Sequence, residues 1–217
     1  VHSRDAFGNW GPCAATTMNV LNILPAADTI FTQNFESGSL TGWSKAGGSA
    51  VADPAAALKG STVGLRVNAG FVVDSHPRRE SGYRARFWYD PNGTLRGGHT
   101  IFEGRTGSNA QVFRVEARRN ATGTYSVRAL VRRAGGMTST GWFTISDGPH
   151  AIEIAWKAGT RANFSLSIDG KVKRSLRRLD THRYRLESVR LGTTASSGAR
   201  AEYFDEFVST KGSRIGP

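Results

Sequence analysis

Apolar and polar residues alternate with a period of two along several short stretches of the chain. In residues 83–89, Tyr83, Ala85, Phe87 and Tyr89 fall on one face of an extended strand, and the residues between them fall on the other. The same alternation recurs in residues 112–118, 125–132, 152–156 and 164–168. Such alternation is typical of β-strands with one buried and one solvated face. Few windows show the apolar spacing of an amphipathic helix, so the pattern predicts a chain made almost entirely of strands.

Turn-forming residues separate these stretches. Clusters of Asp, Asn, Gly and Pro, which tolerate turn geometry, occur at residues 90–93, 120–123, 146–149 and 169–171. Residues 189–191 and 203–208 are expected to form the last two strands. Several short strands punctuated in this way predict an all-β fold, with an antiparallel sandwich or barrel.

The N-terminal residues do not fit the same unit. Residues 1–5 and 16–21 look like two strands around a turn, and two strands cannot bury a core alone. The predicted organisation is therefore a hairpin at residues 1–22, a linker at 23–29 and a β-sandwich at 30–217. The 217 residues contain a single Cys, which excludes an intramolecular disulfide framework and a Cys-based zinc site.

The segment VHSRDAFGNWGP, residues 1–12, resembles the final hairpin of bacterial immunoglobulin-like or fibronectin-type modules. This resemblance implies the tail of a longer multidomain protein that is cut inside such a module. Two alternatives are a hairpin completed by a second chain and an unstructured arm. Because the first residue is Val and no leader pattern follows, a processed product or a fragment is expected.

Four further segments share a resemblance, in the order expected for one domain. They are FESGSLTGWS (35–44), WFTISDGPHAIEIAWKAG (142–159), FSLSIDGKV (164–172) and YFDEFVSTKGSRIGP (203–217). Together they resemble the concanavalin A-like and laminin-G-like jelly rolls, and most of all a type found at the C-terminus of long secreted bacterial proteins. The resemblance implies a jelly-roll sandwich located outside the cell or on its surface.

The net charge of the chain is +12, with 29 Lys and Arg against 17 Asp and Glu. Six of the basic residues are Lys and the rest are Arg, whose planar guanidinium binds carboxylate, sulfate and phosphate through paired hydrogen bonds. A genome rich in Arg codons would explain this composition, and so would a surface for an acidic partner. No stretch approaches the roughly 18 apolar residues of a membrane-spanning helix, so membrane insertion is not expected.

The outward positions of three predicted strands are rich in arginine. If these strands are neighbours, they form a basic stripe made of Arg84, Arg86, Trp88, Arg114, Arg118, Arg128 and Arg132. Such a stripe could bind acidic glycans or an acidic protein. Nucleic acid is not expected, because no nucleic-acid-binding motif is present. The alternative is a solvated sheet face whose arginines pair with Glu80, Glu116 and Glu153.

The jelly-roll resemblance also implies a metal site. Several glycan-binding jelly rolls with similar signatures hold a structural calcium between the first and last strands, which here carry Glu36 and Asp205. Calcium takes six to eight oxygen ligands, so carbonyls and water would supply most of them. The alternative is that both carboxylates bond to backbone or pair with Arg.

Catalysis is not expected. Hydrolases of this superfamily usually carry two carboxylates on one strand in the spacing E-x-D-x-x-E, which neither Glu116, Glu153 nor residues 202–206 reproduce. The five His residues are scattered, and His150 is expected to cap a turn or to lie beside Trp156.

These patterns favour a non-catalytic structural or adhesive module that assembles with itself or with other surface proteins. The alternative is a lectin-like module that binds acidic glycans.

Overall fold

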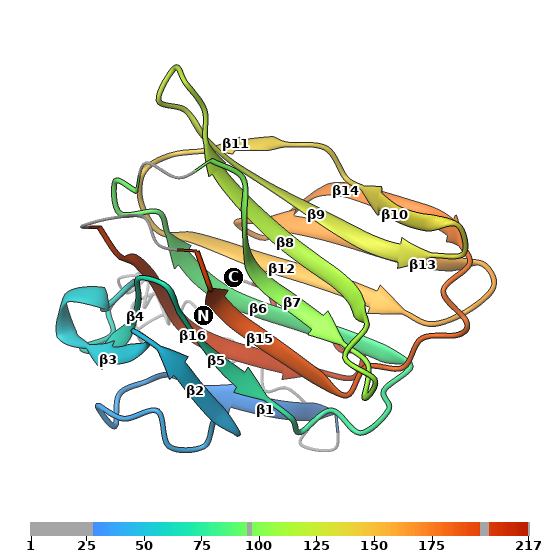
Figure 1. Ribbon diagram of the computed structural model, residues 1–217, viewed down its shortest axis with the longest axis horizontal. Coiled ribbons are helices and arrows are strands. Elements are labelled where there is room, and N and C mark those ends of the chain that lie inside the picture. Colours follow the sequence, from blue (N-terminus) through green and yellow to red (C-terminus); the bar gives the residue numbers. More distant parts are fainter. Residues whose placement is uncertain (1–27, 95–96, 196–199, 217) are drawn as a thin grey trace, which may run out of the picture.

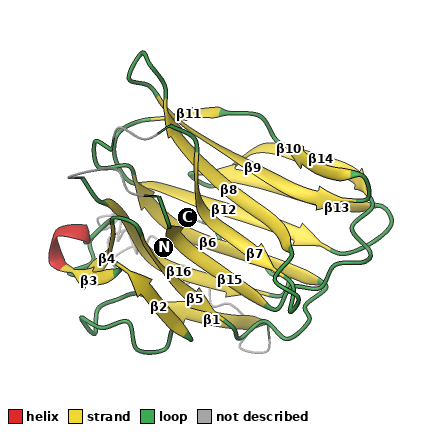
Figure 2. Cartoon of the chain, in the orientation of Figure 1, coloured by secondary structure: helices red, strands yellow, loops and turns green. Residues whose placement is uncertain are grey.

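The computed structural model describes residues 28–94, 97–195 and 200–216. The predicted hairpin at 1–22 and most of the predicted linker lie outside these residues. Within them, strands and loops account for nearly all of the chain, and the helix found there is one 3₁₀ turn, η1 (Pro54–Ala56). Figure 2 shows this turn at one end of a body made of strands.

The strands form two antiparallel sheets. The first, termed the β6 sheet, has the order β14 (Lys171–Leu179), β13 (Ala162–Ile168), β12 (His150–Lys157), β6 (Gly82–Asp90), β16 (Glu202–Thr210), β4 (Gly64–Val67), β3 (Val51–Asp53), with β1 (Thr29–Gln33) also paired to β16. The second, termed the β8 sheet, has the order β10 (Gly136–Ser139), β9 (Tyr125–Arg133), β8 (Gln111–Arg119), β7 (His99–Arg105), β15 (Ser188–Thr193), β5 (Gly70–Asp74), β2 (Lys45–Gly48), with β11 (Phe143–Ile145) also paired to β9. In Figure 1 the two sheets lie one in front of the other as a sandwich.

The core fills the space between the sheets. The alternation predicted for residues 83–89 is confirmed, because Tyr83, Ala85 and Phe87 are fully buried while the residues between them are half-buried on the outer face. Aromatic rings meet across the sandwich: Phe87 of β6 lies 5.1 Å from Phe102 of β7, measured between ring centroids. The predicted antiparallel sandwich is therefore confirmed.

The predicted arginine stripe is wrong as a single surface. Arg84, Arg86 and Trp88 lie on β6, whereas the other four arginines lie on β8 and β9 of the opposite sheet. Because the side chains point outward from both sheets, the two sets are on opposite faces of the sandwich. None of the described helices is long and apolar enough to cross a membrane.

Candidate functional site

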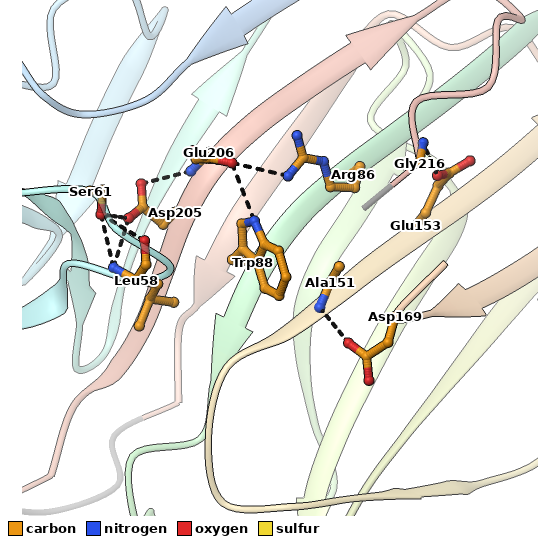
Figure 3. Close-up of polar contacts among 10 residues, drawn as sticks. All are labelled: Leu58, Ser61, Arg86, Trp88, Ala151, Glu153, Asp169, Asp205, Glu206 and Gly216. Atoms are coloured by element: carbon orange, nitrogen blue, oxygen red, sulfur yellow. Dashed lines mark hydrogen bonds and ion pairs between the residues drawn. The ribbon is translucent and has the colours of Figure 1, made fainter. Parts of the chain in front are cut away.

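The outward cations of β6 already have partners. The Arg84 guanidinium pairs with a Glu153 oxygen at 3.0 Å, and Arg86 pairs with Glu206 at 3.2 Å. The indole N–H of Trp88 donates to the same Glu206 oxygen at 3.2 Å, and Glu153 also accepts from the Gly216 N–H at 3.0 Å. Figure 3 shows both carboxylates along this face, Glu206 from β16 and Glu153 from β12. The predicted Arg–Glu153 pairing is confirmed for Arg84.

A β-bulge in β16 brings Glu206 to this face. The register with β6 shifts between Asp205 and Val208, and Glu206 has a φ of 44°. Phe204 and Phe207 are both fully buried, so the two residues between them lie together on the outer side of the strand. In a regular strand, neighbouring residues such as Asp205 and Glu206 point to opposite faces, and the bulge removes this alternation.

The outward cations of the β8 sheet are partnered as well. Glu116 accepts from Arg114 at 2.5 Å and from Arg128 at 2.6 Å. Burial raises the pKa of Glu116, but the hydrogen bonds and charges of Arg128 and Arg114 outweigh burial, so the pKa is lowered overall. Arg118 and Arg128 also lie over the Trp142 ring, at 4.1 and 4.4 Å from its centroid.

The last residue of the predicted set, Arg132, donates from Nε to the Gln111 carbonyl at 2.6 Å. These arginines on the outer faces of both sheets are therefore bound by other groups of the protein, which was the alternative to a binding stripe.

A groove lies on the outer face of the β6 sheet. Its volume is about 670 Å³, and it crosses β6, β12, β13 and β14. The strand register places Ala155, Ser165 and Ser175 in one row across neighbouring strands, with Ser167 in the next row. These short side chains make a low, hydroxyl-rich floor.

Cations surround this floor. Arg84 is neutralised by Glu153, but among the described residues no ion pair is found for Lys157, Arg177 or Lys211, which also line the groove. Arg214 donates to the Gly170 carbonyl at 3.0 Å, a contact that leaves its charge unneutralised. The groove is consequently polar and positively charged.

The C-terminal residues form one wall of the groove. Asp28 accepts from the N–H groups of Gly212 and Ser213, at 3.3 and 2.6 Å, and its carbonyl accepts from the Lys211 N–H at 2.9 Å. These bonds, together with the Gly216 contact to Glu153, fix residues 211–216 against the sheet.

The two residues predicted to hold calcium contact a shared segment. Asp205 accepts from the Leu58 N–H at 2.9 Å and from the Ser61 hydroxyl, while Glu36 accepts from the N–H groups of Thr62 and Val63. β1 pairs with β16 as expected, but β1 ends at Gln33, so Glu36 lies in the following turn and not on the strand. The described residues contain no group of three or more His, Cys, Asp or Glu side chains placed around a metal.

The partners of Glu36 and Asp205 are N–H and O–H donors, so a calcium ion would have to replace them with oxygen ligands. The calcium site stays a prediction. If it forms, calcium at 100 times its dissociation constant should stabilise the fold by about 2.7 kcal/mol and raise the melting temperature. Magnesium at equal ionic strength is the control, and an unchanged melting temperature after chelation would remove the proposal.

His150 caps a turn, which is one of the two arrangements predicted for it from the sequence. Its Nε2 lies 2.8 Å from the Ser146 hydroxyl, and its Nδ1 lies 2.8 Å from Asp169. The same Nε2 also accepts the Ser146 backbone N–H at 3.1 Å, and Asp169 accepts from the Ala151 N–H. The cluster thus ties two neighbouring turns together.

Solved structures share this arrangement of strands. An endo-β-1,4-glucuronan lyase from the fungus Trichoderma reesei matches with a TM-score of 0.63 and 14% identity, over 84% of this chain and 95% of that one. The fold is a jelly roll. The T. cruzi calreticulin globular domain matches this jelly roll with a TM-score of 0.60 and 12% identity, over 84% and 88% of the two chains.

A third match is the ligand-binding domain of botulinum neurotoxin serotype D in complex with N-acetylneuraminic acid. Its TM-score is 0.62 and its identity 11%, and the jelly roll spans 48% of that chain. No family model and no curated protein matches the sequence. At these identities the likeness establishes the jelly roll, and the bacterial, secreted setting stays a prediction.

Proposed function

We propose that this jelly roll is a non-catalytic carbohydrate-binding module whose ligand lies in the groove on the β6 sheet. The observation that carries the proposal is the hydroxyl-lined floor bordered by Lys157, Arg177 and Lys211, for which the described part of the chain holds no ion-pair partner. Ser165, Ser167 and Asn163 can both donate and accept hydrogen bonds, as sugar hydroxyls require. Because the floor side chains are short, a sugar ring can lie flat against the sheet.

Two of the matched structures support an acidic sugar as the ligand class. One acts on glucuronan and one holds N-acetylneuraminic acid, and both sugars carry carboxylates. The domain that holds N-acetylneuraminic acid is about twice as long as the part that matches this chain. The complex therefore supports the class of ligand and not the position of the ligand on the fold.

The absence of glycoside hydrolysis in this proposal rests on the bonds that hold the two carboxylates of this face. Glu153 and Glu206 lie on the strands that flank β6, roughly 10 Å apart by strand spacing. Glycoside hydrolysis needs one carboxyl group that donates a proton and one that attacks or activates water. Each of these carboxylates is instead held by an arginine, and Glu153 also by Gly216.

The proposal includes one form of adhesion, in which a bound glycan attaches the module to an extracellular surface. Self-assembly through an apolar surface has less support, because the only large apolar side chains exposed among the described residues are Val51 and Val172.

Filling the groove tests the proposal. Ser165→Trp places a bulky side chain on the floor without changing charge, and it should weaken glycan binding at least tenfold in calorimetric titration. The matched control is Ser188→Trp, another half-buried serine on a strand of the β8 sheet. Equal affinity in Ser165→Trp and wild type would exclude the groove as the binding site.

A further inference from the structure

We infer that the ligand is a linear acidic polysaccharide whose chain leaves the groove across the edge strand β14. This inference rests on the proposed function and adds to it the class of polymer and a second contact surface.

The edge strand β14 carries an unusual number of free cations. Its five basic residues are exposed, and no side-chain hydrogen bond or ion pair is found for them among the described residues; they are Lys171, Lys173, Arg174, Arg177 and Arg178. The arginines on β6, β8 and β9 that were predicted to bind contact a carboxylate, a backbone carbonyl or the Trp142 ring. With five exposed basic residues for which no ion pair is found among the described residues, β14 carries more unneutralised charge than the other strands described.

Two bulges contribute to this concentration. The pairing of β13 with β14 shifts register between Ala162 and Phe164 and again between Leu166 and Ser167. At the first shift, Arg177 and Arg178 stand opposite Asn163 alone, and Arg178 has a φ of 58°. At the second, Lys173 is the residue without a partner on β13. Each bulge therefore adds a basic residue to the strand.

Protection of the sheet edge explains only part of this charge. Charged residues and bulges on edge strands prevent pairing with other chains, a role that does not require a charged residue to line a groove. Of the β14 cations, Arg177 lines the groove beside Ser175, so the charged edge strand and the groove adjoin at this residue. A continuous surface of this kind matches a ligand that runs from one to the other.

The size of the surface favours a polymer. From β6 to β14 the groove spans three strand spacings, roughly 14 Å, and the cations of β14 lie at its far side. A single sugar cannot contact both ends. Several weak contacts along one chain raise the overall affinity, so binding should strengthen with oligosaccharide length.

The chemistry of the surface favours polysaccharide over nucleic acid. Single-stranded nucleic acids are bound through aromatic side chains on which bases stack. The aromatic residue that lines the groove, Trp156, is only 3% exposed. The groups that remain for binding are arginine guanidiniums and hydroxyls. Guanidiniums match carboxylate or sulfate groups, and hydroxyls match sugar hydroxyls.

The test compares two variants that lose the same charge. The first replaces β14 cations (Lys173→Gln, Arg174→Gln, Arg177→Gln). The control replaces exposed cations elsewhere (Lys45→Gln, Arg78→Gln, Arg79→Gln). Binding of polyglucuronate, a neutral linear glucan and a single-stranded DNA oligonucleotide is measured by titration at low and high salt. Thermal melting confirms that each variant is folded, and Arg177→Gln alone replaces the triple variant if it is not.

Wild type should bind polyglucuronate more tightly than the other two probes and lose affinity at high salt. The β14 variant should bind polyglucuronate at least tenfold more weakly, and the control variant within twofold of wild type. Equal binding of neutral glucan and polyglucuronate, with both unaffected by the β14 changes, would overturn this inference and leave the proposed function standing. Binding of neither glycan would overturn both. Tighter binding of DNA would reassign the surface to nucleic acid.

Discussion

Replacing Phe113 with alanine should lower the free energy of unfolding by about 3–5 kcal/mol, the range for deleting a buried aromatic side chain. Phe113 is fully buried on β8, and its ring lies 6.0 Å from Tyr83 of β6 and 6.3 Å from Phe164 of β13. The ring also rests directly over Gly104, where a Cβ would come within 2.4 Å of it. The substitution therefore opens a cavity between the two sheets.

Urea denaturation followed by tryptophan fluorescence measures this effect. Val172→Ala is the matched control, because Val172 is 61% exposed and should change stability by less than about 0.5 kcal/mol. A loss below 1 kcal/mol in Phe113→Ala would mean that the two sheets do not share the packed core described for them.

Replacing Asp205 with alanine should cost about 1–3 kcal/mol, because the substitution leaves buried donors without an acceptor. Asp205 is fully buried and accepts from the N–H groups of Leu58 and Glu206 and from the Ser61 hydroxyl. Glu36→Ala is the comparison, since Glu36 holds the same segment from an exposed position and should cost less.

The cost of Asp205→Ala should also depend on pH. Burial raises the pKa of Asp205, although hydrogen bonds from Ser61, Leu58 and Glu206 act in the opposite direction. The folded state therefore takes up a proton at a higher pH than the unfolded state. Wild type should gain stability relative to the variant as the pH falls from neutral toward the ordinary carboxyl pKa. A stability difference that shrinks over this range would contradict the raised pKa.

The sequence pattern predicts strands well where one face of the strand is buried. Residues 83–89 and 125–132 alternate because one side chain in two enters the core, and both stretches are strands. β14 escaped prediction because most of its residues, in KVKRSLRRL, are exposed and two bulges interrupt the period. The strand with the most free charge is thus the one that alternation could not reveal.

The sequence could assign arginines to outward positions but not to a sheet. Arg86 and Arg114 have the same local pattern, yet they lie on opposite faces, because the order of strands depends on long-range pairing. The position of Glu206 on the outer face could not be predicted either, since it depends on a bulge that no local sequence pattern indicates. A net charge of +12 alone could not show which cations are neutralised.

The bonds that join Asp28 to residues 211–213 have a mechanical consequence. β1 and β16 are antiparallel neighbours, and Thr29 at the start of one pairs with Thr210 at the end of the other. A pulling force applied to the two chain ends would therefore load the hydrogen bonds between these strands one after another and break them in sequence. Under tension, residues 211–216 would detach from the sheet early, and one wall of the groove would detach with them.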